Sequence, residues 1–88
     1  MTMQTYIALV LKEQGSAWGV NFPDVPGCFS AADRREDILP SAIAALGLHL
    51  DGRDGPEARD VTEIAANPEF AEELRAGAFL IEVPYDTA

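Results

Sequence analysis

The chain has 88 residues, of which 48% are apolar, so it is long enough for one folded domain and too apolar for a disordered tail. Fifteen acidic residues against six Lys and Arg residues give a net charge of −9. This charge repels phosphate backbones and anionic membranes, so we expect no direct nucleic-acid or membrane binding, and the acids either attract a basic protein partner or simply keep the chain in solution.

The first predicted elements are two strands of a hairpin. Residues 5–11 (TYIALVL) are β-rich and apolar on both faces, which is typical of a strand inside a sheet. Residues 13–16 form a polar, Gly-containing connection. Trp18, Val20 and Phe22 then fall on alternate positions, which predicts a half-buried second strand with one aromatic face.

A rigid turn is predicted between the second and third strands. In residues 22–28 (FPDVPGC), Pro26 presets one central residue and Gly27 supplies the positive φ of the other, as a type II turn requires. Pro23 cannot donate a ladder hydrogen bond, so the second strand should stop just before it. A third strand follows over residues 28–31.

An amphipathic helix is predicted next, because the apolar period changes to three and four residues. Its apolar stripe should face the sheet and comprises Leu39, Ala42, Ile43, Leu46 and Leu50. Pro40 is compatible only with a first helical turn, so the regular helix should begin near Glu36 or Asp37. The polar segment 51–56 ends it.

The last third predicts an acidic connector over residues 51–63 and a short helix after it. Asn67 has the character of an N-cap, and Pro68 suits the first helical position. Gly77 stands where a C-terminal cap belongs. Between these ends, Phe70 and Leu74 make one apolar contact line.

Residues 78–83 (AFLIEV) predict a final strand that Pro84 stops. A right-handed crossover would lay this strand parallel to the first, with the main helix on one sheet face. The expected fold is a single α+β domain over residues 1–88, with the element order β-β-β-α-(α)-β and the strand order 3-2-1-4. Open edges at residues 28–32 and 78–83 would favour self-association.

The composition also bears on chemistry and location. Cys28 is the single cysteine, and a buried, unreactive thiol is the favoured interpretation. His49 is the single histidine, and a solvated or dipole-complementing role near the helix end is favoured. We expect no metal and no cofactor. A signal peptide and an apolar run of about 20 residues are both absent, so cytoplasmic residence is expected.

Residues 6–33 (YIALVLKEQGSAWGVNFPDVPGCFSAAD), followed by an Ala/Leu-rich helix, resemble the HicB family, antitoxins of HicA–HicB toxin–antitoxin systems. The match extends to about residue 50 and more loosely to Val83. The family pattern F-P-D-L-P-G-C occurs here with Val25 for Leu, and Trp18 stands at a Tyr position. Ala32-Asp33-Arg34 replaces the family's Gly-Asp-Thr.

The resemblance implies a partial ribonuclease-H-like fold and an antitoxin that binds a small basic HicA-like toxin and blocks its action on mRNA. Many relatives carry a DNA-binding segment after the last strand. This chain stops at Ala88, so the resemblance does not imply operator binding for it.

Two alternative functions stay open. A degenerate ribonuclease-H-like nuclease would need several carboxylates converging on the sheet to hold two metal ions. Residues 6–11 contain no acid, and Asp33, Glu36 and Asp37 lie at the end of the sheet and the start of the helix, so we expect no enzymatic activity. The other alternative is an orphan interaction module without a toxin.

Six residues are candidates for contact with the toxin: Trp18, Phe22, Asp24, Pro26, Phe29 and Asp33. Structural roles compete with this interpretation, because Asp24 can satisfy the turn backbone and Asp33 can cap the helix. Trp18 and Phe29 are expected to lie mostly in the core, with an exposed edge as an interface anchor. The connector acids are a solvated face or a mimic of a phosphate track: Asp51, Asp54, Glu57, Asp60 and Glu63.

Overall fold

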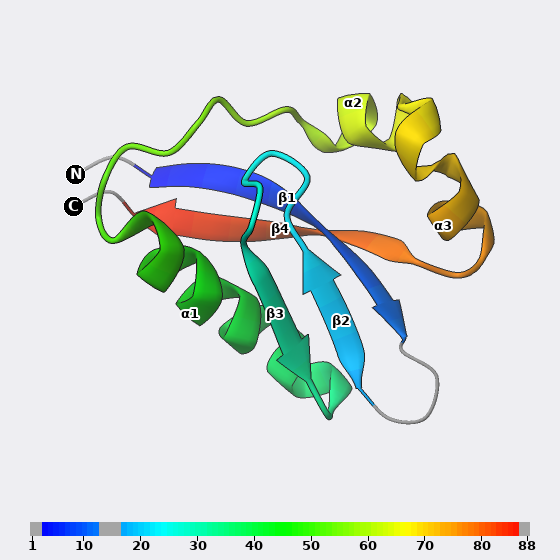
Figure 1. The fold of residues 1–88 in the computed structure, drawn as a ribbon, viewed down its shortest axis with the longest axis horizontal. Helices are drawn as coiled ribbons and strands as arrows, with labels where there is room; N and C mark the ends of the chain where they lie inside the picture. Colours follow the sequence, from blue (N-terminus) through cyan, green and yellow to red (C-terminus); the bar gives the residue numbers. More distant parts are fainter. Residues whose placement is uncertain (1–2, 13–16, 87–88) are drawn as a thin grey trace.

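The computed structural model describes residues 3–12 and 17–86, which form a four-stranded sheet with helices on both faces (Figure 1). The strands are β1 (Met3–Lys12), β2 (Trp18–Asn21), β3 (Phe29–Ala32) and β4 (Phe79–Asp86). The helices are η1 (Arg35–Asp37), α1 (Ile38–Leu50), α2 (Val61–Ala66), η2 (Pro68–Phe70) and α3 (Ala71–Arg75), where η denotes a 3-10 helix. The α+β class and the order β3-β2-β1-β4 are confirmed, while the connection expected at 13–16 lies outside the described residues.

β1 is the central strand and is buried on both faces, as its continuous apolar sequence predicts. Tyr6, Ala8 and Val10 join the core beneath α1, whereas Ile7 and Leu9 join a second, smaller core beneath α2, η2 and α3. Adjacent residues of a strand point to opposite faces, so one apolar run supplies both cores.

β4 runs antiparallel to β1, with Val10 opposite Phe79 and Met3 opposite Asp86, so the predicted parallel pairing is wrong. A single crossover helix would have returned the chain to the end of the sheet at which β1 starts. Instead α1 runs back along one face, and residues 51–78 then cross the molecule in the other direction (Figure 1). Two passes bring β4 in from the end at which β1 finishes.

The buried stripe of α1 is narrower than predicted. It consists of Ile38, Ala42, Leu46 and Leu50, spaced four residues apart, whereas Leu39 and Ile43 are 43% and 40% exposed. The two exposed residues each follow a buried one, and one residue turns the helix by about 100°, which carries them off the sheet. The placement of Pro40 in the first turn is confirmed.

The helix α2 was not predicted, and the acidic connector ends at Asp60 instead of residue 63. Asp60 Oδ1 accepts a hydrogen bond of 2.8 Å from the Glu63 backbone N–H, and Glu63 Oε1 accepts one of 3.1 Å from the Asp60 backbone N–H. This capping box begins a helix that buries Ile64 completely.

The predicted ends of the next helix are confirmed, although it starts as η2 before continuing as α3. Asn67 Oδ1 accepts a hydrogen bond of 2.9 Å from the Glu69 backbone N–H, and Gly77 ends the helix with φ at 111°. The prediction that Pro84 stops the last strand is wrong, because Pro84 pairs with Thr5 inside β4. An edge strand tolerates proline when the missing N–H would face the open side.

The segment between α1 and α2 is fastened over the aromatic end of the sheet. The Tyr6 hydroxyl donates a hydrogen bond of 2.6 Å to the Pro56 carbonyl, and the Tyr85 hydroxyl donates one of 2.7 Å to the Arg53 carbonyl. A Cβ atom on Gly55 would overlap the Tyr6 hydroxyl, so glycine is required where the chain crosses this ring.

Candidate partner-binding surface

The FPDVPGC segment is first of all a structural turn. Gly27 has φ at 85°, and the Cys28 backbone N–H donates a hydrogen bond of 3.1 Å to the Val25 carbonyl, which confirms the predicted turn. Phe22, Val25 and Cys28 are buried, so the loop is pinned to the core under α1. Burial raises the pKa of the Cys28 thiol, in agreement with the predicted unreactive cysteine.

Asp24 holds two distant segments together. Its carboxylate accepts hydrogen bonds of 2.7 Å from both the backbone N–H and the Nε of Arg59. The Asp24 side chain is 8% exposed and that of Arg59 37%. The carboxylate therefore serves neither the local backbone of the turn, as one interpretation expected, nor an open surface that a partner can reach easily.

Trp18 is half-buried at the start of β2, at the end of this strand that lies away from the Asp24 turn. It belongs to a small cluster of aromatic and basic side chains. Its ring makes an edge contact with Phe79 at a centroid distance of 5.9 Å. The Lys12 ammonium lies 4.7 Å from the Trp18 ring centroid, and the Arg35 guanidinium lies 5.6 Å from it. Two of the six basic side chains are thus engaged by aromatic faces in this cluster.

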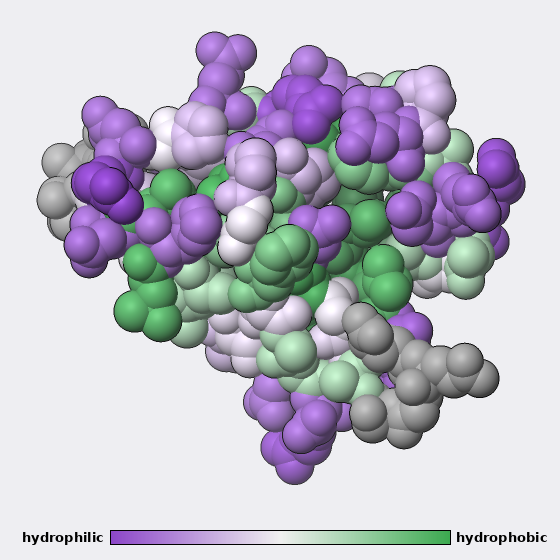
Figure 2. Space-filling model, viewed as in Figure 1, coloured by the Kyte–Doolittle hydropathy of each residue, from purple (hydrophilic) through white to green (hydrophobic). Residues whose placement is uncertain are grey.

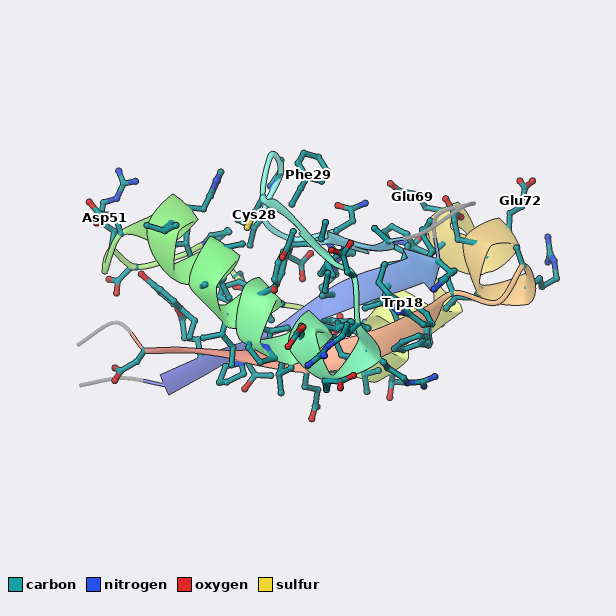
Figure 3. All side chains as sticks on the ribbon, turned by 90° about the horizontal axis from the view of Figure 1, so that it is seen from below. Trp18, Cys28, Phe29, Asp51, Glu69 and Glu72 are labelled. Carbon is teal, nitrogen blue, oxygen red and sulfur yellow. The ribbon has the colours of Figure 1, made fainter. Side chains whose placement is uncertain are left out.

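Phe29 does not lie in the core, contrary to the prediction, but is 66% exposed. Phe29 pairs with Asn21 in β2, whereas the next pair is Ser30 with the buried Val20, so alternation along the strands directs Phe29 away from the core under α1. Figure 3 shows the Phe29 ring projecting away from the sheet and from α1. One hollow beside it is lined by Ala45, Leu48 and His49 of α1, and another by Leu11 of β1 with Gly19 and Asn21 of β2.

The second hollow belongs to a part of the sheet that no helix covers within the described residues. α2, η2 and α3 pack on β1 and β4, where Ile64 and Phe70 bury their side chains, and they leave this side of β2 and β3 open. We call this part the open sheet face, and it consists of Leu11, Gly19, Asn21, Phe29 and Ala31. Figure 2 shows apolar surface over β2 and β3, bordered by hydrophilic groups.

One acidic side chain adjoins the open sheet face, and two more project on the same side of the molecule. Glu73 lines a further hollow that shares Leu11 with the open sheet face. Figure 3 shows Glu69 and Glu72 projecting on the same side of the molecule as Phe29. Among the connector acids, by contrast, Asp60 and Glu63 are occupied in the capping box of α2.

The six candidate residues therefore differ in exposure. Pro26, Phe29 and Asp33 are exposed, and Trp18 and Asp24 are partly buried. Phe22 is 1% exposed and offers no surface to a partner. Within the described residues Asp33 makes no cap bond to η1, which follows Arg34 without a side-chain cap. A role for any of the six in binding stays a prediction. Gly19 and Ala31 were not singled out, although a pair of small residues in neighbouring strands is a signal for close approach.

The described part of the chain offers little for metal chemistry or membrane insertion. Residues 3–12 and 17–86 contain no group of three or more His, Cys, Asp or Glu side chains that could hold a metal ion. None of their helices has the length and apolarity needed to cross a membrane.

A family model and solved structures both relate the chain to HicB antitoxins. The family described as "HicB_like antitoxin of bacterial toxin-antitoxin system" matches residues 6–85. An uncharacterized 14.9 kDa protein of Haemophilus phage HP1 is 27% identical over 67 residues, which are 70% of this chain and 50% of that protein. The chain thus spans about half the length of this curated relative.

Two solved structures are similar over nearly their whole length. A chain of the HicA3 and HicB3 toxin–antitoxin complex has a TM-score of 0.75 and 27% identity, with 94% of this chain and 99% of that chain covered. The N-terminal domain of Burkholderia pseudomallei antitoxin HicB has a TM-score of 0.73 and 29% identity, with coverages of 91% and 95%.

Proposed function

Because the chain belongs to the HicB-like antitoxin family of bacterial toxin–antitoxin systems, we propose that it binds a small basic HicA-like toxin and covers it stoichiometrically. The observation that carries this proposal is the likeness to a chain solved in the HicA3 and HicB3 complex, which extends over 94% of the present chain. Membership of the family supports a role as an antitoxin, and we propose a HicA-like toxin as its partner.

The mechanism we propose is occlusion without chemistry. A toxin that cleaves RNA must attract a phosphate backbone, and an antitoxin with a net charge of −9 presents the same sign of charge to it. The long central strand is filled with buried apolar side chains and supplies no carboxylate in residues 6–11. We therefore expect no nuclease activity from the chain itself.

Co-expression with the protein encoded by the adjacent small basic reading frame tests the proposal. The two proteins should co-purify, and titration of the chain into the toxin should abolish RNA cleavage at a fixed molar ratio. Added salt should weaken the complex, because screening reduces the attraction between opposite charges. Failure to co-purify and to relieve toxicity would contradict the proposal, as would magnesium-dependent RNA cleavage by the purified chain alone.

Self-association is a further part of the proposal. β3 and β4 are the edge strands of the sheet, and β4 is the longer of the two. A hollow lined by Arg35, Leu39, Phe79 and Ile81 adjoins the β4 edge. We expect the molar mass measured by light scattering to rise with concentration above that of a monomer. The partial ribonuclease-H-like classification of the fold remains a prediction.

A further inference from the structure

We propose that the toxin docks on the open sheet face, with Phe29 as its apolar anchor and the glutamates of η2 and α3 as its electrostatic border. This inference rests on the proposed function, because it names the surface by which the antitoxin meets its toxin. The occupant we propose is a basic protein.

The first argument is the exposure of Phe29. An aromatic side chain that is 66% exposed keeps much of its apolar surface in water, and aromatic residues dominate the binding energy of protein interfaces. β3 places the ring at the rim of two hollows, one beside α1 and one on the open sheet face. A partner can therefore enclose the ring from both sides.

The second argument is the shape of the face next to Phe29. Gly19 and Ala31 are register partners in β2 and β3, and neither carries a side chain longer than a methyl group. The backbone of a partner can approach the sheet closely at such a pair. Asn21 is the register partner of Phe29 and supplies an amide for hydrogen bonding beside the ring.

The negative charge near the open sheet face favours a basic protein as the partner. Glu73 lines the hollow that shares Leu11 with the face, and Glu69 and Glu72 project on the same side of the molecule as Phe29 (Figure 3). Lys12 also lines this hollow, but its ammonium lies over the Trp18 ring, 4.7 Å from the ring centroid. A second copy of this chain would bring its own net charge of −9 against the same acids, whereas a basic toxin complements them.

The test compares variants on the open sheet face with a control elsewhere. Phe29→Ala should weaken binding to the toxin of the adjacent reading frame at least about 30-fold by calorimetry, as expected for the loss of an anchor. Ile43→Ala removes another exposed apolar side chain, on α1, and should leave the affinity within about 2-fold, since it lies outside the face. Both sites are exposed, and melting curves should show that both variants stay folded.

A second pair of variants tests the charged border. Glu69→Gln, Glu72→Gln and Glu73→Gln in combination should slow association by about 10-fold at low salt and flatten its salt dependence. The matched control carries three neutralised acids away from the face, Glu36→Gln, Asp37→Asn and Glu82→Gln. It has the same net charge, so a smaller effect from the control separates local contact from overall charge.

Three results would contradict this inference, and they differ in whether the proposed function also fails. If Phe29→Ala and the glutamate variant bind like the unmodified chain, or if the two control variants lose as much affinity, the assigned surface is wrong although the proposed function stands. If Phe29→Ala changes the assembly state of the chain without changing toxin affinity, the face is a self-interface and the inference is also overturned. If the unmodified chain itself does not bind the toxin, the proposed function fails and the inference fails with it.

Discussion

The two faces of the sheet are built to different extents. On one face α1 covers all four strands with a core that includes Tyr6, Val20, Leu46 and Val83. On the other face α2, η2 and α3 cover β1 and β4 with a smaller core around Ile64, and no helix among residues 3–12 and 17–86 covers β2 and β3. Since the core under α1 contains more buried residues, we expect it to supply most of the stability, which leaves part of the other face available for binding.

The largest effect is expected from a substitution that creates a cavity in the larger core, under α1. Leu46 is fully buried in the middle of α1, so Leu46→Ala should lower the free energy of unfolding by about 3–4 kcal/mol. Leu48→Ala is the matched control, because the same substitution two residues away affects a side chain that is 82% exposed and should change stability by less than about 0.5 kcal/mol. Urea denaturation measures both, and equal losses would break the comparison.

A cavity in the smaller core should cost less and act locally. Ile64 is fully buried, but its surroundings lie at one side of the sheet and can relax, so we expect Ile64→Ala to cost about 2–3 kcal/mol. Hydrogen exchange should accelerate in α2 and α3 more than in α1, because local opening follows low local stability. Uniform acceleration throughout the chain would show that the two faces unfold as one unit.

The link between the two faces can be tested at Asp24, which binds Arg59 in the connector. Asp24→Asn removes the charge that strengthens both hydrogen bonds and should destabilise the fold by about 1.5 kcal/mol. Asp33→Asn is the control at an exposed aspartate close by in the sequence and should be neutral within about 0.5 kcal/mol. An equal effect of both substitutions in thermal denaturation would argue against the anchor.

The start of α2 gives a smaller effect. Asp60→Ala removes the side-chain acceptor of the capping box and should cost about 1 kcal/mol. Because the cap belongs to the smaller face, exchange should rise first at the amide of Glu63, which loses its acceptor. Unchanged protection of that amide would contradict the assigned role of the cap.

The smallest expected effect is a loss of folding stability at alkaline pH, caused by two ionisable side chains that are buried in the larger core. Burial raises the pKa of Cys28 above 9.0 and that of Tyr6 above 10.0. In each case the unfolded chain loses its proton first, so stability should fall as the pH rises through 9.0 and then 10.0. Cys28→Ala should remove the first part of this decline in urea midpoints, and an unaltered decline would assign it elsewhere.

Local chemistry predicted much of the fold. The continuous apolar run of β1, the Pro26-Gly27 turn and the Asn67 cap each act within a few residues, and the structure contains all three. The direction of β4 could not be predicted in this way, because it depends on the path of residues 51–78 through space. The missed helix α2 is a different case, since its capping box is a local signal that the sequence already contains.

The candidate surface was harder to predict than the fold. Phe29 is a large apolar residue of a type that is usually buried. Its exposure follows from the absence of a helix over β2 and β3 within the described residues. Asp24 looks like an ordinary turn aspartate, and its partner Arg59 lies 35 positions along the chain. Both cases depend on what the rest of the molecule places beside a side chain.

The antiparallel pairing of β1 with β4 has a mechanical consequence. Met3 and Asp86 are register partners, so the chain enters and leaves the domain at a single point. A force that draws these ends apart would act across the two strands and break the hydrogen bonds between them one after another. The bonds would not share the load, as they would if the force acted along the strands. Traction on the two ends should therefore open the sheet at low force, with β4 peeling away from β1 first.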